Sequence, residues 1–191
     1  MDQLPAWAVR LAAEFTASDT RAEAAARGLT RAEFNWKPRP DAWSIGQCLE
    51  HLAAGNALYL DAIDAALTAS PPTGPVAEVT PGAFSRWFLR AYIEPSPETK
   101  RGRSPGKIRP AADIDPATLD RFLRSNERAR GLIRRAADYD VNRVRFRNPF
   151  VWLIRFTVGT GFLVLSGHER RHLLQAERVK ADSVQNRTDP V

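Results

Sequence analysis

The sequence is poor in the residues that several common kinds of site require. Its 191 residues include one cysteine, Cys48, which excludes an intramolecular disulfide framework and a Cys-x-x-Cys pair. There is no Ser-His-Asp order of a hydrolase and no glycine-rich phosphate loop. Only three histidines are present, His51, His168 and His172. Any site based on imidazole must use these three side chains.

Long apolar runs are also absent. The most apolar stretch, residues 150–167, is interrupted by Arg155 and contains three glycines, so we expect a buried segment rather than a membrane span. The amino terminus has an acidic second residue, Asp2, and lacks the basic-then-apolar order of a secretory signal. We therefore expect a cytoplasmic protein without a membrane partner.

Apolar residues recur at helical spacing in four long segments, which predicts an all-α protein. The expected helices cover residues 4–27, 44–69, 115–137 and 161–180. A chain of this length with 43% hydrophobic residues is long enough for one domain with a substantial core. We expect a single domain over residues 1–181 and a flexible, polar tail over 182–191.

The connections between these helices are uneven in length. Residues 70–114 form a long crossover between the second and third helices, which suits helices that run parallel. Aromatic side chains in its one helical pattern, residues 83–93, are candidates to cover a site near His51. Residues 138–158 are expected to be irregular, with Trp152, Leu153, Ile154 and Phe156 adding to the core.

The last predicted helix carries His168 and His172 in the spacing His-x-x-x-His. Side chains four residues apart lie on one helix face, so the two rings can bind one metal ion together. They fall within an apolar stripe, whereas Glu169, Arg170 and Arg171 are expected to point elsewhere. The histidines should therefore face the interior of the protein.

A third ligand would have to come from His51, the only other histidine, at the rim of the buried face of the second helix. Three imidazoles would leave a coordination position open for water or a thiol, as in catalytic sites. All-nitrogen ligation favours zinc or nickel, with iron and copper as alternatives. The plainer alternative is that these are hydrogen-bonded core histidines.

Several polar residues lie near the histidines in sequence. Gln175 follows His172 by three residues, so it can accept an imidazole N–H or contact bound water. Glu50 and Glu169 each adjoin a histidine, but neighbours on a helix point about 100° apart, so neither should touch a metal. Cys48 is expected to be a buried structural thiol. The pattern H-E-x-x-H also fits a zincin, although no third histidine follows it.

Two segments, WSIGQCLEHL at 43–52 and HERRHLLQA at 168–176, resemble the two signatures of the DinB superfamily. That superfamily includes bacillithiol transferases and mycothiol-dependent maleylpyruvate isomerases, and the resemblance spans about residues 8 to 181. It implies a four-helix bundle in which one histidine of the second helix and the H-x-x-x-H of the fourth bind a divalent metal. The implied ligands are His51, His168 and His172.

The net charge of +6 raises the alternative of a nucleic-acid partner. Much of the excess lies in residues 100–109 and 143–147, and neither segment shows a helix-turn-helix or interleaved aromatics. We therefore do not expect a nucleic-acid partner. The arginines are better suited to attract an anionic substrate or cofactor.

The sequence thus indicates a metal-dependent thiol S-transferase or hydrolase. Its metal would activate a thiol or water toward a small electrophilic substrate, with a low-molecular-weight thiol as the candidate cosubstrate. The alternative is a stress-associated protein that binds a metal or small ligand without turnover. Helix faces rich in alanine and leucine are compatible with a homodimer.

Overall fold

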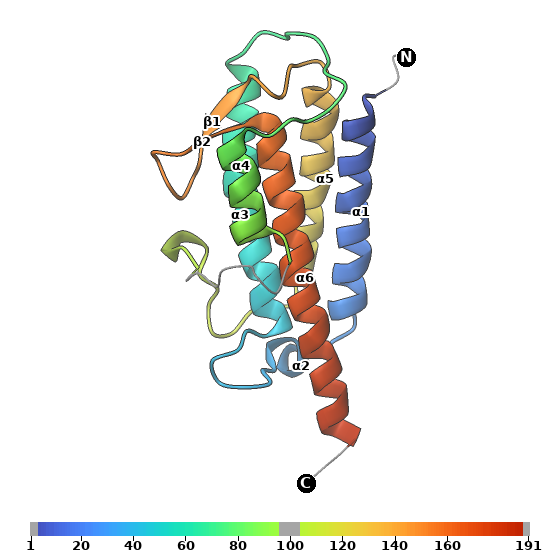
Figure 1. The fold of residues 1–191 in the computed structure, drawn as a ribbon. Helices are drawn as coiled ribbons and strands as arrows, with labels where there is room; N and C mark the ends of the chain where they lie inside the picture. The colour runs from blue at the N-terminus through green and yellow to red at the C-terminus, as the bar shows by residue number, and fades with distance from the viewer. Residues whose placement is uncertain (1–3, 96–103, 189–191) are drawn as a thin grey trace.

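Four long α-helices make up most of the computed structural model, which describes residues 4–95 and 104–188 (Figure 1). They are α1 (Ala6–Ala26), α3 (Ile45–Thr68), α5 (Thr118–Ala136) and α6 (Val158–Thr188). The shorter elements are α2 (Arg31–Asn35), α4 (Ala83–Phe88), the π-helical turn η1 (Leu89–Ile93), the 3-10 turn η2 (Gly106–Ile108), and the strands β1 (Arg145–Arg147) and β2 (Arg155–Thr157). The predicted all-α bundle is confirmed.

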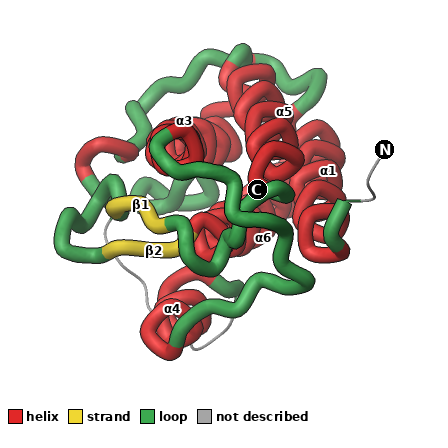
Figure 2. The backbone as a smooth tube through the Cα atoms, turned by 90° about the horizontal axis from the view of Figure 1, so that it is seen from above, coloured by secondary structure: helices red, strands yellow, loops and turns green. Residues whose placement is uncertain are grey.

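The four helices surround a common core. α3 packs against α5 and α6, and α1 packs against the same two helices, so α1 and α3 lie at opposite corners (Figure 2). α3 and α5 run in the same direction along the bundle (Figure 1). The chain between them must therefore return along the bundle, and the predicted long crossover does this.

Local signals in the sequence set two of the helix boundaries. Gly28 adopts a φ of +80° just after α1 ends, a conformation that a residue with a Cβ rarely adopts. At the start of α3, Ser44 Oγ accepts from the Gln47 amide at 3.1 Å, and Gln47 Oε1 accepts from the Ser44 amide at 3.2 Å. Because Gln47 Oε1 is used in this reciprocal cap, its position in the sequence is explained without a role in a functional site.

The apolar core is divided into two clusters by a polar layer. One cluster, near the hairpin end, includes Trp7, Ile63 and Phe162; the other, near α2, includes Leu49 and Leu173. Between them each long helix places buried polar side chains, which together we call the polar layer: Ser18, His51, Asn56, Asn126 and Glu169. The three histidines that the sequence offers as candidate metal ligands lie at this level of the bundle.

Two boundaries near α5 and α6 differ from the predictions. α5 begins at Thr118 rather than at Asp115, because residues 115–117 form a turn in which Asp115 Oδ1 accepts from the Ala117 amide at 2.9 Å. α6 begins at Val158 and continues to Thr188, so residues 182–188 of the expected tail are helical. Residues 189–191 lie outside the described part of the chain.

The segment predicted to be irregular contains an antiparallel hairpin. β1 and β2 pair Arg145 with Thr157, Phe146 with Phe156, and Arg147 with Arg155. Phe146 and Phe156 are buried, whereas the turn between the strands is exposed. The prediction of core residues here is confirmed for Phe156, which is buried, and for Ile154, which packs against the core. It is wrong for Trp152 and Leu153, whose side chains are 69% and 73% exposed. In the described residues no helix is both long and apolar enough to span a bilayer.

Replacing Gly161 with alanine should lower the free energy of unfolding by about 1–3 kcal/mol, because the core is too tightly packed there. A Cβ on Gly161 would lie 2.7 Å from Phe146 Cε1 and 3.0 Å from Ile63 Cδ1. Gly131→Ala is the matched control in α5, where a Cβ would meet only Arg134 Nη2 at 3.9 Å. That variant should gain about 0.5–1 kcal/mol. Urea unfolding of both variants is the measurement, and equal effects would contradict the packing argument.

Candidate metal centre

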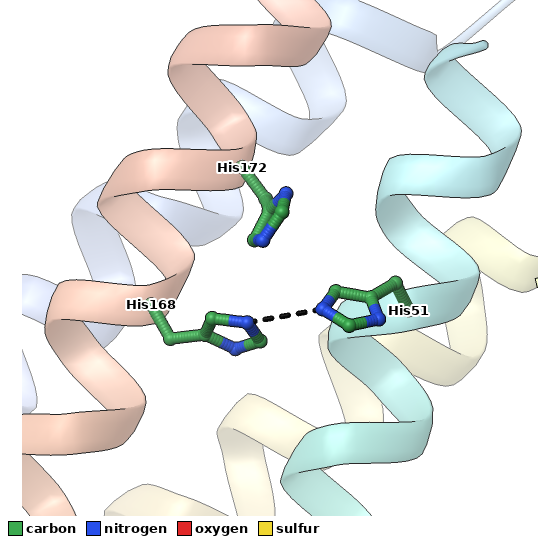
Figure 3. Close-up of side chains that lie close together, drawn as sticks. All are labelled: His51, His168 and His172. Carbon is green, nitrogen blue, oxygen red and sulfur yellow. Dashed lines mark hydrogen bonds between the residues drawn. The ribbon is translucent and has the colours of Figure 1, made fainter. Parts of the chain in front are cut away.

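The three histidines come together at the polar layer (Figure 3). His51 of α3 faces His168 and His172 of α6. The Nε2 atoms of His51 and His168 are 3.1 Å apart. Ring centroids are 4.9 Å apart for His51 and His168 and 4.7 Å apart for the other two pairs. Residues separated by 117 positions in the chain thus meet at one point.

Hydrogen bonds on the far side of two rings set their orientation. His51 Nδ1 lies 2.9 Å from the Ile108 carbonyl oxygen, which can only accept, so Nδ1 carries the proton. His172 Nδ1 lies 3.1 Å from Gln175 Oε1 and donates to it in the same way. Both Nε2 atoms therefore carry a lone pair, and that of His51 accepts a hydrogen bond from His168 Nε2 at 3.1 Å. The contact foreseen for Gln175 is present.

All three imidazoles are held in the neutral form. Burial lowers the pKa of His172 to about 3, and the nearness of a second ionisable ring, His51, and of the Arg171 guanidinium adds to the effect. Burial also lowers the pKa of His168 well below its usual value, and that of His51 less, because the bond to Ile108 opposes the shift. Neutral imidazole is the form that binds metals.

The residues present fit a divalent metal ion. One candidate ligand atom from each histidine can be chosen so that all three lie within 4.8 Å of one another. Two nitrogens that share a tetrahedral zinc ion are about 3.3 Å apart, given bonds of about 2 Å. The separation of 3.1 Å between His51 and His168 is close to this value, and the chemistry of the donors suits zinc, nickel, iron or copper.

Trp43 forms an aromatic wall beside the histidines. Its ring stacks on His172 at 5.5 Å with an interplanar angle of 22°, and it meets the edge of His51 at 4.9 Å. In the sequence this tryptophan is the first residue of the segment 43–52 that resembles a family signature, with no role assigned to it. Nothing in the sequence signals the contact, because it depends on how the loop before α3 folds back.

The crossover also reaches the site, through a different part than expected. Ser104 Oγ lies 3.3 Å from His51 Nδ1, next to the hydrogen bond that this nitrogen donates to the Ile108 carbonyl oxygen. The aromatic side chains of α4 and η1 lie elsewhere: Phe84 and Phe88 pack beside Phe156 of the hairpin. The segment that covers His51 is therefore the one around η2.

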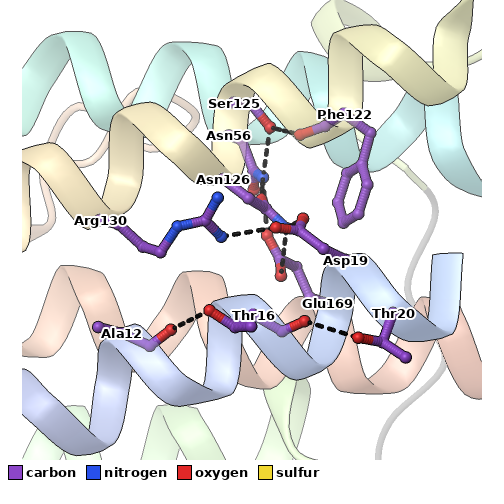
Figure 4. A network of polar contacts seen from close by, with 10 residues as sticks. All are labelled: Ala12, Thr16, Asp19, Thr20, Asn56, Phe122, Ser125, Asn126, Arg130 and Glu169. Atoms are coloured by element: carbon purple, nitrogen blue, oxygen red, sulfur yellow. Dashed lines mark hydrogen bonds and ion pairs between the residues drawn. The ribbon is translucent and has the colours of Figure 1, made fainter. Parts of the chain in front are cut away.

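Glu169 lies inside the bundle, which corrects the expectation that it points away from the buried stripe. It is fully buried, and Asn56 Nδ2 and Asn126 Nδ2 donate to its carboxyl oxygens at 2.8 and 3.4 Å (Figure 4). Burial raises the pKa of Glu169 to about 8, although the hydrogen bonds oppose this. α6 is buried on more than one side. A prediction that assumes one buried stripe per helix therefore could not place this residue.

The same polar layer continues to α1. Asn126 Nδ2 donates to Asp19 Oδ1 at 2.8 Å, and Arg130 pairs with the other Asp19 oxygen at 2.6 Å (Figure 4). Within the described residues, Asn56 Oδ1 is the one buried side-chain oxygen or nitrogen without a hydrogen-bond partner. The layer is thus almost completely satisfied by its own members.

The remaining candidates have structural partners. Glu50 forms an ion pair with Arg121 of α5, so its carboxylate is turned away from the histidines. Arg170 pairs with Glu14 of α1 and Glu94 at the end of η1. Cys48 is completely buried and burial raises its thiol pKa to about 12, as expected for a structural cysteine.

Arg171 is more than a surface charge. Its Nη1 donates to the Tyr92 carbonyl oxygen at 2.6 Å, and its side chain is half-buried. The guanidinium also lowers the pKa of all three histidines. A fixed positive charge therefore lies close to the metal-binding candidates. The other basic residues noted in the crossover, Lys100, Arg101 and Arg103, lie outside the described part of the chain.

Comparison with known proteins identifies one family. The model of the DinB superfamily matches residues 14–176, a range that includes all three histidines and most of the bundle. No match was found among curated proteins or among solved structures.

Stability of the metal-free protein should fall as pH drops below about 6.5. The folded histidines have lowered pKa values, so the unfolded chain binds protons first and is favoured. The contribution is fully present above pH 6.5 and is lost toward about pH 3. Urea unfolding in the presence of a chelator, across this range, is the measurement. His172→Gln should flatten the dependence, and an unchanged slope would contradict it.

Glu169 should have the opposite effect at higher pH. Its folded pKa of about 8 lies above the unfolded value of 4.5, so the folded state keeps a proton that the unfolded state loses. Stability should therefore fall as pH rises to about 8, and the fall should be visible from about pH 6.5, above which the histidine contribution no longer changes with pH. In the parent protein the free energy of unfolding should decrease by at most about 1.4 kcal/mol per pH unit, and Glu169→Gln should abolish this decrease. Parallel slopes for the two proteins would refute the prediction.

Proposed function

The chain belongs to the DinB superfamily, and we propose that it is a metal-dependent enzyme acting on a small electrophilic substrate. In this proposal His51, His168 and His172 hold a divalent metal, with zinc or nickel preferred over iron or copper. The observation that carries the proposal is the meeting of three neutral imidazoles from α3 and α6 at one point. The two reactions proposed are thiol S-transfer and hydrolysis.

A divalent metal at this position would supply Lewis acidity, which lowers the pKa of water or of a thiol toward neutral pH. The chain's own residues prepare the site for it. Ile108 and Gln175 hold the Nδ1 protons of His51 and His172, so both Nε2 lone pairs face the centre. Such partners of ligand rings fix their orientation and tautomer.

The surroundings support an uncharged or anionic small substrate. Trp43 supplies an apolar face that touches two of the histidine rings, and such a face excludes water from a reacting group. Arg171 adds a positive charge nearby, which would attract an anionic group such as a carboxylate of a low-molecular-weight thiol. We include such a thiol as the candidate cosubstrate.

One observation favours the alternative of a metal-binding or small-ligand-binding protein without turnover. Neither carboxylate beside a histidine is available as a general base at the site. Glu50 is paired with Arg121, and Glu169 is hydrogen-bonded to Asn56 and Asn126. Proton transfer by a side chain requires hydrogen-bond reach of the reacting group. Turnover would therefore rely on the metal and the imidazoles alone.

The wider proposal is that the protein works in the cytoplasm, on a small molecule, and forms a homodimer. A single buried thiol suits a reducing compartment.

Metal binding is the first test. The purified protein should bind one divalent ion per chain, measured by elemental analysis and calorimetric titration with zinc and nickel. His168→Ala should lose the ion, and Gln175→Leu should weaken affinity about 10- to 100-fold because His172 loses its partner. Cys48→Ala is the control and should retain full stoichiometry, since its thiol is not a ligand. Full metal content in His168→Ala would disprove the site.

Turnover is tested on the same metal-loaded preparations. A fluorescent electrophile offered with a panel of low-molecular-weight thiols should be conjugated, and ester or amide probes should report hydrolysis. Activity should be lost in His168→Ala and survive in Cys48→Ala. Stoichiometric metal without any turnover across the panel would support the non-catalytic alternative.

A further inference from the structure

The turn between β1 and β2 carries three consecutive exposed apolar side chains. Val151, Trp152 and Leu153 are 45%, 69% and 73% exposed. The adjoining Phe150 and Ile154 pack against the core, so the tip projects while its base is held. Contiguous exposed apolar groups of this kind mark interaction surfaces rather than ordinary surface residues.

The shape of this turn is fixed by a buried asparagine. Asn148 Oδ1 accepts from the amides of Phe150 and Val151 at 2.8 and 3.0 Å. Its Nδ2 donates to the hydroxyl of Tyr59 in α3 at 2.9 Å, which ties the turn to the bundle. The Ile154 amide closes the turn on the Val151 carbonyl at 2.9 Å. A preformed tip loses little conformational entropy when it binds.

The outer face of the same hairpin is strongly basic. Arg145, Arg147 and Arg155 are exposed, and Arg147 lies directly opposite Arg155 across the two strands. Like charges in this arrangement repel each other. Residues 141–168 contain no aspartate or glutamate, and no ion pair involves these three arginines in the described chain. An anionic partner would relieve the repulsion.

We propose that this hairpin docks on the surface of an anionic phospholipid bilayer. Val151, Trp152 and Leu153 would enter the interface between headgroups and acyl chains, where tryptophan is favoured. Arg145, Arg147 and Arg155 would lie at the level of the lipid phosphates, with their aliphatic stems over the apolar region. Arg147 Nη1 reaches the Trp152 carbonyl at 3.4 Å, so charge and apolar tip are adjacent.

The chemistry of the tip favours a lipid surface over a nucleic acid. Only one of the three tip side chains is aromatic, and aliphatic side chains neither stack on bases nor hydrogen-bond to them. Strands of three residues extend about 10 Å, and they offer a single short row of arginines for phosphates. A flat anionic surface requires no more than this. The expectation of no membrane partner rested on the absence of a spanning segment, which surface attachment does not need.

The full-length protein should sediment with vesicles of phosphatidylcholine and phosphatidylglycerol in equal parts, and not with phosphatidylcholine alone. The double variant Trp152→Ser, Leu153→Ser should bind at least about tenfold more weakly. Arg147→Gln, Arg155→Gln should reduce binding about thirtyfold, and added salt should weaken the parent similarly. Circular dichroism and the metal content of each variant show whether the bundle is intact.

Two matched variants serve as controls. Val9→Ser removes an apolar side chain that is 54% exposed on α1, and Arg134→Gln, Arg178→Gln removes two exposed charges on α5 and α6. The proposal is supported if the tip variants lose binding to anionic vesicles while these controls keep it. It is overturned by no binding to anionic vesicles or by equal losses in the controls. Binding of duplex DNA without vesicle binding, or a dimer that the tip variant alone loses, would also overturn it.

Discussion

Burial of polar groups in the middle of the bundle is the constraint on which the rest of the structure depends. Each long helix places a polar residue between two apolar clusters, and a buried polar group destabilises the fold unless it is hydrogen-bonded. The amides of Asn56 and Asn126 meet the carboxyls of Glu169 and Asp19, so the four helices have one register that satisfies the layer. Sliding any helix would leave these groups unpaired.

The histidines lie within this layer and share its physical cause. Burial keeps the imidazoles neutral, and it keeps Glu169, the neighbour of His168, protonated near neutral pH. The polar layer therefore contains neutral imidazoles whose Nε2 atoms meet, with the lone pair of His51 accepting from His168 Nε2 at 3.1 Å. Arg171 places the nearby positive charge at the edge, bound to the Tyr92 carbonyl, where it remains half-exposed to solvent. The site therefore has a positive charge at its rim and neutral imidazoles inside.

Much of this arrangement can be predicted from the sequence. Helical periodicity predicts the four long helices, and the capping pair Ser44 and Gln47 marks the start of α3. Because the chain has only three histidines, a three-imidazole site can be formed by one set of residues alone. The buried position of Glu169 could not be predicted, because an acidic residue off the apolar stripe is normally solvated and its partners come from α3 and α5. Trp43 and the hairpin were missed for a related reason: loop conformation depends on tertiary contacts such as Asn148 with Tyr59.

The division of the core into two apolar clusters also affects local opening of the structure, the process that hydrogen exchange measures. Cooperative opening units in proteins follow contiguous packing, and here the packing is interrupted at the level of the histidines. Amides near α2 and those near the hairpin belong to separate packing regions, which can open with different free energies. A ligand that bridges α3 and α6 at the boundary would couple the two regions and slow hydrogen exchange in both. Occupancy of the site would then change the hydrogen-exchange rates of backbone amides far from it, both near α2 and near the hairpin.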